Sequence, residues 1–257
     1  MGVSMKNEID IYKQGNVELL FCSSTHSFPL HSHESWCIGM VTEGEVLFGI
    51  HDEECLLKRG MLYVIPSNTG VRIIAKKKYK YITICLKSEL REYFNTCILE
   101  HYFMQLLDID GFLKPCYGFM WDGDENELAK EILALIQPIL KKEQYDTGHL
   151  VSDVIQNASK YIRKLNGEKF DLNNIAAAVN LSKYHLVRQF KKEMGVTPNQ
   201  YYIQNKLRIV KAELLAEQAE ADIAAELNYA DQSHLCRQFK KMMGISLQEY
   251  KRNIRIK

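Results

Sequence analysis

The stretches HLVRQFKKEMG (residues 185–195) and HLCRQFKKMMG (residues 234–244) contain nearly the same eleven residues, forty-nine positions apart. Upstream, the match continues at an offset of forty-eight, as between Asn180 and Asn228. One residue has therefore been gained or lost in the connection that precedes each stretch. A length change confined to a turn indicates that the flanking segments are helices kept as units, so the sequence predicts two helix-turn-helix copies.

Each repeated stretch has the pattern of an amphipathic helix with a capped beginning. Ser182 and Asp231 stand where an N-cap residue belongs, because their side-chain oxygens can accept the free amide protons of the first turn. One apolar face is predicted to be core in both copies: Leu186, Phe190 and Met194, and then Leu235, Phe239 and Met243. The opposite face is polar and basic: Tyr184, Arg188 and Lys191, and then Ser233, Arg237 and Lys240, with Val187 and Cys236 at its margin.

The outward face carries the side-chain types that bind DNA. An arginine on a helix in the major groove can make a bidentate contact with guanine, and Gln232 can do the same with adenine. Tyr184 or Val187 can contact a thymine methyl group, while lysines further along suit the phosphates. The alternative is a helical repeat protein whose basic faces are merely solvated. We favour DNA binding, because solvation does not require a capped, tightly turned helix pair to occur twice.

Charge separates the two halves of the 257-residue chain, whose formal net charge is +1. Residues 150–257 contain 18 Lys and Arg against 11 Asp and Glu, whereas residues 1–149 contain 15 against 21. A basic C-terminal half is typical of a protein in which only that half meets a polyanion such as nucleic acid. A difference in surface composition alone would look the same, so the charge by itself leaves both interpretations open.

The N-terminal half has the pattern of a strand-rich domain followed by a helix. Between Phe21 and Leu86, short runs rich in Val, Ile, Phe and Tyr alternate with Gly, Asn and Pro, which predicts an antiparallel sandwich or barrel. The segment 125–144 then places an apolar stripe (128–140) on a helix that Pro138 is expected to kink or break. This stripe either packs on its own barrel or meets its counterpart in a dimer. The predicted parts are a ligand-binding domain (1–110), a helical dimerisation or linker region (111–147) and a DNA-binding domain (148–257).

Seven cysteines are scattered widely along the chain and include no Cys-x-x-Cys pair. This spacing argues against a disulfide framework and a structural zinc site, and it favours reduced thiols in the cytosol. The N-terminus lacks the basic-then-apolar layout of a signal peptide, and no apolar run approaches the length that spans a bilayer. We therefore expect a soluble, cytoplasmic protein with no membrane partner.

The second copy, DQSHLCRQFKKMMGIS with IAAELNYA before it and EYKR after it, resembles the signature of the AraC/XylS family of bacterial transcription regulators. The first copy, NLSKYHLVRQFKKEMGVTPNQYY, resembles that family's first helix-turn-helix. The resemblance implies a seven-helix DNA-binding domain in which a long helix, from Pro198 to about Gln218, separates two reading helices. These helices would enter successive major-groove segments about 34 Å apart.

The resemblance also implies which residues contact DNA. Base or backbone contacts are implied for four residues in each copy: Lys183, Tyr184, Val187 and Arg188, and then Gln232, Ser233, Cys236 and Arg237. Lys191 and Lys240 are expected to bind phosphates. The second copy departs from the family pattern at three places: Asn228-Tyr229 replaces Gly-Phe, Leu247 replaces Pro, and Glu220 stands near a usually apolar position. Asparagine can still supply a left-handed residue, so the departures concern how the second unit is seated.

In the N-terminal half, FPLHSHESWCIGMVTEGEVLFGI and LKRGMLYVIPSN resemble the cupin-like barrel that serves many of these regulators as a ligand and dimerisation domain. A metal-binding cupin would add a Glu a few residues after its His-x-His and a third His near residues 68–71, and neither is present. We therefore expect no metal and no cofactor. We instead expect a small-molecule pocket lined by some of four residues: His31, His33, Trp36 and Tyr63. A metal site and purely structural histidines are the alternatives.

The predicted fold is a two-domain α+β protein, with an N-terminal cupin-like antiparallel β-barrel plus a helical region and a C-terminal all-α double helix-turn-helix domain. The predicted function is a sequence-specific transcription regulator, not an enzyme, switched by a small molecule in the barrel. Its expected partners are double-stranded DNA, RNA polymerase and a small-molecule effector. The protein is either a monomer or a homodimer.

Two alternative functions are open. A cupin-type oxygenase or isomerase fused to a DNA-binding domain would need the missing metal ligands. A DNA-repair regulator with a zinc-bound cysteine would need clustered cysteines.

Overall fold

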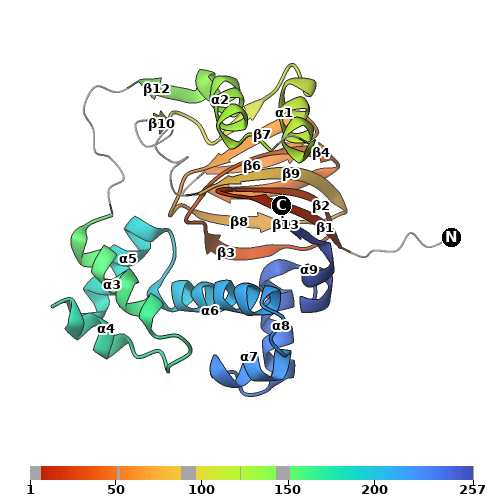
Figure 1. Cartoon of the computed structure of the whole chain (residues 1–257). Coiled ribbons are helices and arrows are strands. Elements are labelled where there is room, and N and C mark those ends of the chain that lie inside the picture. The colour runs from red at the N-terminus through yellow and green to blue at the C-terminus, as the bar shows by residue number, and fades with distance from the viewer. Residues whose placement is uncertain (1–6, 51–52, 88–96, 122, 143–150, 257) are drawn as a thin grey trace.

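The computed structural model describes residues 7–50, 53–87, 97–121, 123–142 and 151–256. Its N-terminal part consists mainly of strands with two helices on one side, and its C-terminal part consists of helices (Figure 1). This arrangement confirms the predicted α+β class. The predicted boundary between the linker region and the DNA-binding domain lies outside the described residues.

The N-terminal strands form two sheets with a shared core and a short two-stranded ribbon. In spatial order, the seven-stranded sheet contains β11 (Phe103–Gln105), β7 (Met61–Ile65), β4 (Trp36–Glu43), β9 (Tyr79–Leu86), β2 (Val17–Ser24), β1 (Glu8–Gln14) and β13 (Ile254–Ile256). The four-stranded sheet contains β3 (Phe28–Ser32), β8 (Gly70–Ile74), β5 (Glu45–Ile50) and β6 (Glu53–Lys58). The ribbon pairs β10 (Cys97–Leu99) with β12 (Leu140–Lys142). The apolar runs of the sequence form β4, β5, β7, β8 and β9, as predicted.

Strand β4 shows why the seven-stranded sheet is covered on both faces. Trp36 and Ile38 belong to a core that the sheet shares with α1 (Asp110–Trp121) and α2 (Glu125–Ile136). Cys37, which lies between them in the chain, belongs to the core between the two sheets. Because side chains alternate across a strand, a strand that is buried on both faces is apolar at nearly every position.

The apolar stripe of α2 packs on the protein's own sheet. Leu128, Ile132 and Ile136 are fully or almost fully buried in the core beneath the helix. The helix ends at Ile136, and Pro138 lies in a 3-10 turn, η2 (Gln137–Ile139), so the predicted break at the proline is confirmed. Of the two interpretations of the stripe, the structure supports packing on the N-terminal domain.

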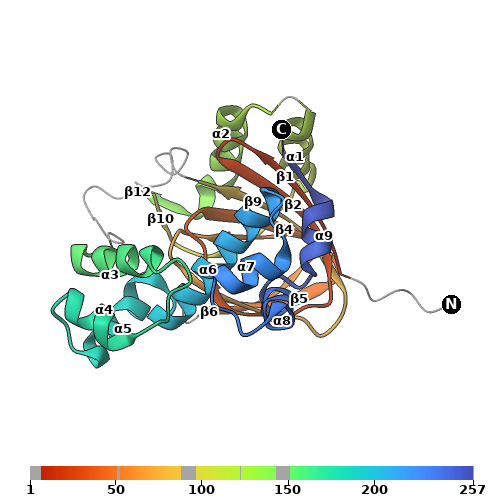
Figure 2. The same cartoon turned by 60° about the horizontal axis from the view of Figure 1, so that its bottom comes forward.

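Seven helices fill residues 151–256: α3 (Asp153–Lys164), α4 (Leu172–Ala178), α5 (Lys183–Met194), α6 (Pro198–Leu215), α7 (Glu220–Glu226), α8 (Gln232–Met243) and α9 (Leu247–Asn253). They form two small units joined by α6, which contributes side chains to the core of each (Figure 2). The long helix ends at Leu215, three residues before its predicted end, and Glu217 then adopts a left-handed conformation with φ 66°. The predicted seven-helix arrangement is therefore present.

The C-terminal end of the chain differs from the all-helical prediction. Residues Ile254–Ile256 form β13, which pairs in parallel with β1 through Ile11 and its partner Ile254. The core of the second helical unit also includes Ile9 and Ile11, so the sheet and this unit share apolar side chains. Sequence periodicity missed the strand because its pairing partner lies at the other end of the chain.

Candidate nucleic-acid interface

The connection between the two helices is built the same way in both copies. Asn180 and Asn228 adopt the left-handed conformation, with φ of 54° and 55°. In each copy, the amide of the following residue donates to the carbonyl five residues earlier, at 3.0 Å and 2.9 Å. Ala230 is the additional residue of the second copy, because the equivalence changes from forty-eight to forty-nine there. The length change thus lies in the turn, as predicted, and leaves both helices intact.

The beginnings of the two reading helices are capped as predicted. The hydroxyl oxygen of Ser182 accepts from the amide of His185 at 3.2 Å, and the carboxylate of Asp231 accepts from the amide of His234 at 2.6 Å. An N-cap of this kind stabilises a helix by about 1 kcal/mol. The caps fix where each reading helix begins and therefore which side chains point outward.

The ten residues predicted to contact DNA all lie on exposed or partly exposed positions of α5 and α8: Lys183, Tyr184, Val187, Arg188, Lys191, Gln232, Ser233, Cys236, Arg237 and Lys240. Tyr184 is 77% exposed, a large fraction for an aromatic side chain. The opposite faces are buried, except that Met243 is only partly buried. The protein's interior therefore leaves these faces free, while the DNA contacts themselves remain a prediction.

Glu220 engages part of the reading face of the second unit. Its carboxylate accepts from the Gln232 side-chain amide at 2.9 Å and from the Cys236 thiol at 3.8 Å. Burial and this carboxylate together raise the pKa of the Cys236 thiol. Glu220 thereby occupies one of the two N–H donors of the Gln232 amide. The sequence identified Glu220 as a departure from the family pattern but gave no sign of this contact.

The N-terminal domain contacts both reading helices at the same structural position, their C-terminal glycine caps. Gly195 has φ 70°, and a Cβ atom there would lie 2.1 Å from the amide nitrogen of Gly70 at the start of β8. At the second cap, Gly244, the carbonyl accepts from the Asn7 side chain at 2.8 Å. His26 also docks there, with its Nε2 donating to the Lys241 carbonyl at 2.9 Å. Residues of the N-terminal domain therefore contact the C-terminal ends of both α5 and α8.

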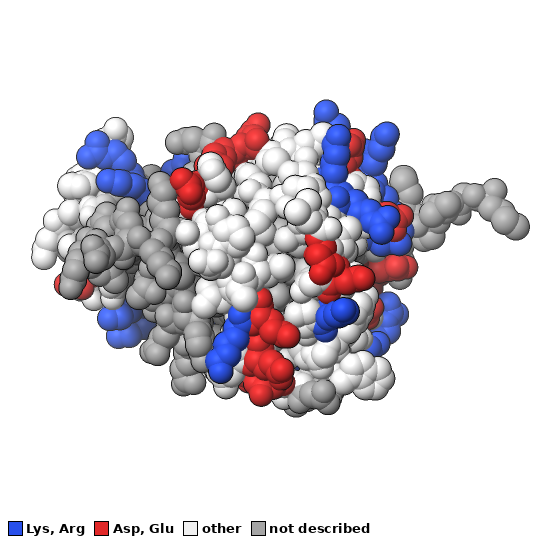
Figure 3. All heavy atoms as spheres, turned by 90° about the horizontal axis from the view of Figure 1, so that it is seen from above, with Lys and Arg blue, Asp and Glu red and all other residues white. Residues whose placement is uncertain are grey.

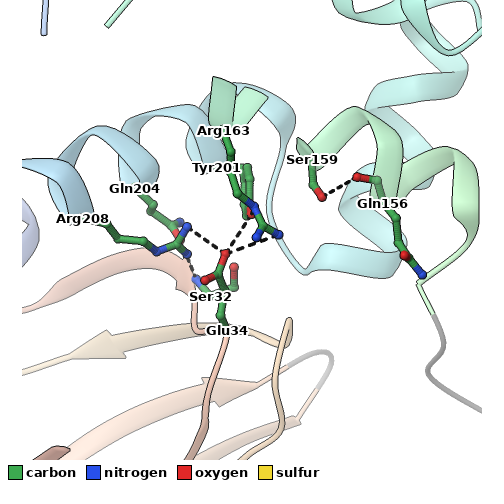
Figure 4. A network of polar contacts seen from close by, with 8 residues as sticks. All are labelled: Ser32, Glu34, Gln156, Ser159, Arg163, Tyr201, Gln204 and Arg208. Carbon is green, nitrogen blue, oxygen red and sulfur yellow. Dashed lines mark hydrogen bonds and ion pairs between the residues drawn. The ribbon is translucent and has the colours of Figure 1, made fainter. Parts of the chain in front are cut away.

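A polar network around Glu34 joins the N-terminal domain to the first helical unit (Figure 4). One carboxylate oxygen of Glu34 lies 3.1 Å from Arg208 and 3.7 Å from Arg163, and it accepts from the Tyr201 hydroxyl at 2.9 Å. Arg163 also donates to the Tyr201 hydroxyl at 2.9 Å. Nearby, the Ser32 amide donates to the Gln204 side chain at 3.4 Å. Three donors from α3 and α6 thus converge on one carboxylate from the β3–β4 connection.

The four residues predicted to line a ligand pocket occupy three different environments. His31 and His33 lie together at the end of β3, with ring centroids 4.9 Å apart. Trp36 packs against the α1 and α2 side of the seven-stranded sheet, whereas Tyr63 is buried between the sheets and hydrogen-bonds Thr83. The structure therefore brings the two histidines together but places Trp36 and Tyr63 on opposite faces of one sheet.

Burial sets the protonation state of His31. It lowers the pKa of the ring to about 3, and the neighbouring His33 adds to the lowering. The ring is therefore neutral at pH 7, and its Nδ1 lies 2.7 Å from the Pro29 carbonyl, which it can reach only as a donor. Within the described residues, no three His, Cys, Asp or Glu side chains are arranged to hold a metal ion.

Glu18 is a second charged group at the junction of the domains. Burial by itself would raise the pKa of this carboxyl, but Lys87 and Lys211 outweigh that effect, and the pKa is lowered. Lys87 forms an ion pair with Glu18, and burial lowers the pKa of Lys211 on α6. The junction therefore places Lys211 of the helical side near Glu18 of the sheet side.

The opposite side of the molecule differs from the basic helical domain. On the face seen from above Figure 1, the side of α1 and α2, acidic and basic side chains both occur around an uncharged area (Figure 3). No helix among the described residues is long and apolar enough to cross a membrane. The exposed basic side chains of α5 and α8 are candidates for binding a polyanion.

Two family models match the chain: an AraC-like ligand binding domain over residues 19–149 and a helix-turn-helix domain over residues 175–253. YbfI of Bacillus subtilis (strain 168), an uncharacterized HTH-type transcriptional regulator, is 24% identical over 223 residues, which cover 80% of each protein. ToxT from Vibrio cholerae O395 superposes with a TM-score of 0.62 at 10% identity, over 96% of this chain and 97% of ToxT. ToxT from Vibrio cholerae strain SCE256 with a bound unsaturated fatty acid matches with a TM-score of 0.59 at 10% identity, over 95% of this chain and 94% of that one. The chain therefore shares the two-domain fold of ToxT.

Proposed function

Because this chain belongs to the AraC-type transcription regulators, with an N-terminal AraC-like ligand-binding domain and a C-terminal helix-turn-helix domain, we propose that α5 and α8 read two successive major-groove segments. Arg188 and Arg237 would contact base edges, and Lys191 and Lys240 would bind phosphates. The observation that carries the proposal is the matching pair of capped helices with exposed polar faces. The regulator would act in the cytosol on RNA polymerase at promoters.

The two reading units contact the N-terminal domain through different residues, and only the first contacts Glu34, which supports a switch. The second unit shares an apolar core with β1 and β2. The first unit packs Leu30 of β3 against its core and is also held by the Glu34 network and the contact between Gly70 and Gly195. The side chains of Glu34 and Arg208 are 39% and 33% exposed, so water and other ions can compete for their contacts. An effector bound near Glu34 would therefore act first on the first unit.

We propose a carboxylate as the polar group of the effector. ToxT was solved with a bound unsaturated fatty acid, and in this chain Arg163, Tyr201 and Arg208 already hold a carboxylate, that of Glu34. The side-chain nitrogen of Gln204 is buried beside them and has no hydrogen-bond partner within the described part of the chain. A carboxylate effector would compete with Glu34 for these donors, with His31 and His33 nearby on the sheet side.

Selection of bound sequences from a random DNA library tests the DNA-binding proposal. The expected result is a site with two conserved segments whose centres lie about one helical turn apart. Recovery of sequences with no common element would contradict the proposal. Mass measurement of the protein–DNA complex would also establish whether one copy or a homodimer binds.

Oleate, with oleyl alcohol as a control that lacks the carboxylate, tests the effector proposal. Oleate is expected to raise the melting temperature and to change DNA affinity, and Arg208→Gln should weaken oleate binding about tenfold or more. Arg72→Gln removes a guanidinium paired with Glu54 on the four-stranded sheet and should leave oleate binding unchanged. Equal effects of the alcohol and the acid would contradict a carboxylate site.

The alternative function is a cupin-type enzyme fused to a DNA-binding domain. Metal analysis of the purified protein distinguishes this enzyme from a regulator without a metal. A stoichiometric transition metal would support the enzyme, because such cupins act through a metal held by histidine and carboxylate side chains.

A further inference from the structure

Two cysteine side chains face each other in the N-terminal domain. Cys37 of β4 and Cys85 of β9 are direct partners in the antiparallel ladder, and their sulfur atoms lie 3.4 Å apart as free thiols. Opposite residues in such a ladder have Cα atoms about 4.5–5.5 Å apart. Disulfides form over Cα separations of about 4.4–6.8 Å, so the spacing of paired strands is compatible with a bond between the two sulfurs.

The surroundings favour a thiolate on Cys37. The hydrogen bond from Cys85 lowers the pKa of Cys37 against the effect of burial, and His33 lowers it further. The same hydrogen bond and burial raise the pKa of Cys85. The Ser35 hydroxyl lies 3.7 Å from the Cys37 sulfur. These opposite pKa directions favour Cys37 as the nucleophile and Cys85 as the thiol that donates to it.

The other buried cysteines have the opposite character. Burial raises the pKa of both Cys22 and Cys116 to about 12. A thiol with such a pKa is almost entirely protonated at pH 7 and is a poor nucleophile. Cys22 lies on β2, the strand next to β9, so it provides a matched comparison within the same sheet.

We propose that Cys37 and Cys85 form a dithiol site that hydrogen peroxide oxidises reversibly to a disulfide. The Cys37 thiolate attacks one peroxide oxygen, the O–O bond breaks, and the other oxygen leaves as hydroxide, which is protonated to water. Cys85 then attacks the sulfur of the resulting sulfenic acid, the S–O bond breaks, and a second water leaves with the remaining thiol proton. The two sulfurs lose two electrons and the peroxide gains two.

The position of the pair connects this chemistry to the junction of the domains. Cys37 follows Glu34 by three residues, at the beginning of the strand that the β3–β4 connection enters. Oxidation would draw the sulfurs from 3.4 Å to about 2.05 Å and tie that beginning to β9. The site is independent of which effector or DNA sequence the protein binds.

Treatment of the reduced, full-length protein with a small excess of hydrogen peroxide tests the proposal. After denaturation and alkylation, the number of free thiols is expected to fall from seven to five, and dithiothreitol should restore seven. Trypsin would release Cys85 alone in residues 81–87, linked to residues 14–58, which contain Cys37, Cys22 and Cys55. Fragmentation of the linked peptide should place the bond at Cys37.

Matched variants sharpen the test. Cys85→Ser is expected to abolish the linked peptide, whereas Cys55→Ser should retain it. The peptide map of the unaltered protein needs no variant, so a substitution that prevents folding would not block the test. Retention of all seven thiols, a bond at Cys22 or Cys55, or oxidation of Cys37 to a sulfinic acid without a disulfide would each overturn the proposal.

Discussion

We expect single residues to determine which bases each helix-turn-helix unit recognises. Arg188 and Arg237 occupy equivalent positions of the repeat, but their neighbours differ. The Arg188 guanidinium lies 5.9 Å from the centre of the Tyr184 ring, whereas α8 has the smaller Ser233 at the equivalent position. The aromatic ring restricts the orientations of Arg188. The two units are therefore expected to recognise different base steps.

Arg188→Ala and Arg237→Ala are each expected to lose about 1–3 kcal/mol of discrimination at one base step, in different segments of the site. The physical reason is the loss of a bidentate contact with guanine. Binding to a library of single-base variants of the selected site measures the effect.

Lys191→Ala provides the control for both arginine variants. It should weaken binding to all sequences alike and lower the slope of log affinity against log salt by about one, because it removes a phosphate contact. The assignment of the arginines fails if both arginine variants keep the full sequence preference.

His31 is expected to make folding sensitive to acid. Its pKa is about 3 in the folded protein and 6.5 in the unfolded chain, so between these values only the unfolded chain binds the proton. Stability contributed by the neutral ring is therefore present above pH 6.5 and is lost as the pH falls, by at most about 1.4 kcal/mol per pH unit. His31→Asn removes this titration and should reduce the loss of unfolding free energy between pH 7 and pH 5 by about 1–2 kcal/mol.

Urea unfolding of both proteins at the two pH values measures the difference. His33 and Lys211 also act on the ring, and both remain in the variant. An equal loss of stability in the two proteins would show that His31 is charged in the folded state.

At the scale of elements, the ends of the two reading helices matter as much as their faces. Both helices begin at a capping side chain and end at a left-handed glycine. The C-terminal ends of the two helices have different neighbours. Gly195 faces the backbone of Gly70, whereas Gly244 faces the side chain of His26. A side chain can move aside more easily than a backbone segment, so the two caps differ in how much they tolerate a Cβ atom.

Gly195→Ala is expected to lower the free energy of unfolding by about 2 kcal/mol or more. A left-handed alanine costs about 1–2 kcal/mol, and its Cβ atom would lie only 2.1 Å from the Gly70 nitrogen. Gly244→Ala should cost less, because its closest neighbour is the His26 ring at 3.1 Å. Gly118→Ala in α1 meets nothing within 4 Å and should stabilise the protein by about 0.5–1 kcal/mol. Thermal unfolding of the three variants measures these changes in stability. A larger loss of stability for Gly244→Ala than for Gly195→Ala would contradict the docked arrangement.

At the scale of the whole molecule, the domains meet through apolar, backbone and ionic contacts. The second unit shares a core with β1 and extends the sheet through β13. The first unit meets the sheets through the glycine contact and the carboxylate of Glu34. Ionic contacts weaken with salt, while apolar contacts do not. Salt is therefore expected to weaken the contacts of Glu34 with Arg208 and Arg163.

A double-mutant cycle with Glu34→Gln and Arg208→Gln is expected to give a coupling energy of about 0.5–1 kcal/mol at low salt. The value is modest because both side chains are about one third exposed. The pair of Glu54 and Arg72, at 2.6 Å and 52% exposure on both sides, provides the control and should couple by about 0–0.5 kcal/mol. Urea unfolding with and without 1 M salt measures both cycles. A coupling energy for Glu34 that is no larger than the control would contradict its role in holding the domains together.

Part of this organisation could be predicted from short-range patterns. The helix caps at Ser182 and Asp231 and the left-handed Asn228 all follow from interactions within one or two helical turns. The same holds for the apolar faces of α5 and α8, because 3.6 residues per turn fixes which side chains share a face. The candidate DNA contacts were identified from this periodicity together with the family resemblance, and the structure places them at exposed or partly exposed positions.

Other features depend on residues far apart in the chain. The pocket predicted from His31, His33, Trp36 and Tyr63 illustrates the limit, since Trp36 and Tyr63 lie on opposite faces of one sheet. Which face a strand residue occupies relative to another strand depends on the pairing register, which no local pattern contains. The Glu34 network and the Cys37–Cys85 pair were missed for the same reason.

The sequence by itself determined the two helix-turn-helix units, their caps and their outward faces, because the forces that define them act between residues a few positions apart. Only the tertiary structure decided that β13 joins the N-terminal sheet, that Asn7 docks on Gly244, 237 residues away, and that Glu34 meets Arg208. These contacts form when distant segments bury surface together, and their register and charge pairing exist only in the folded chain.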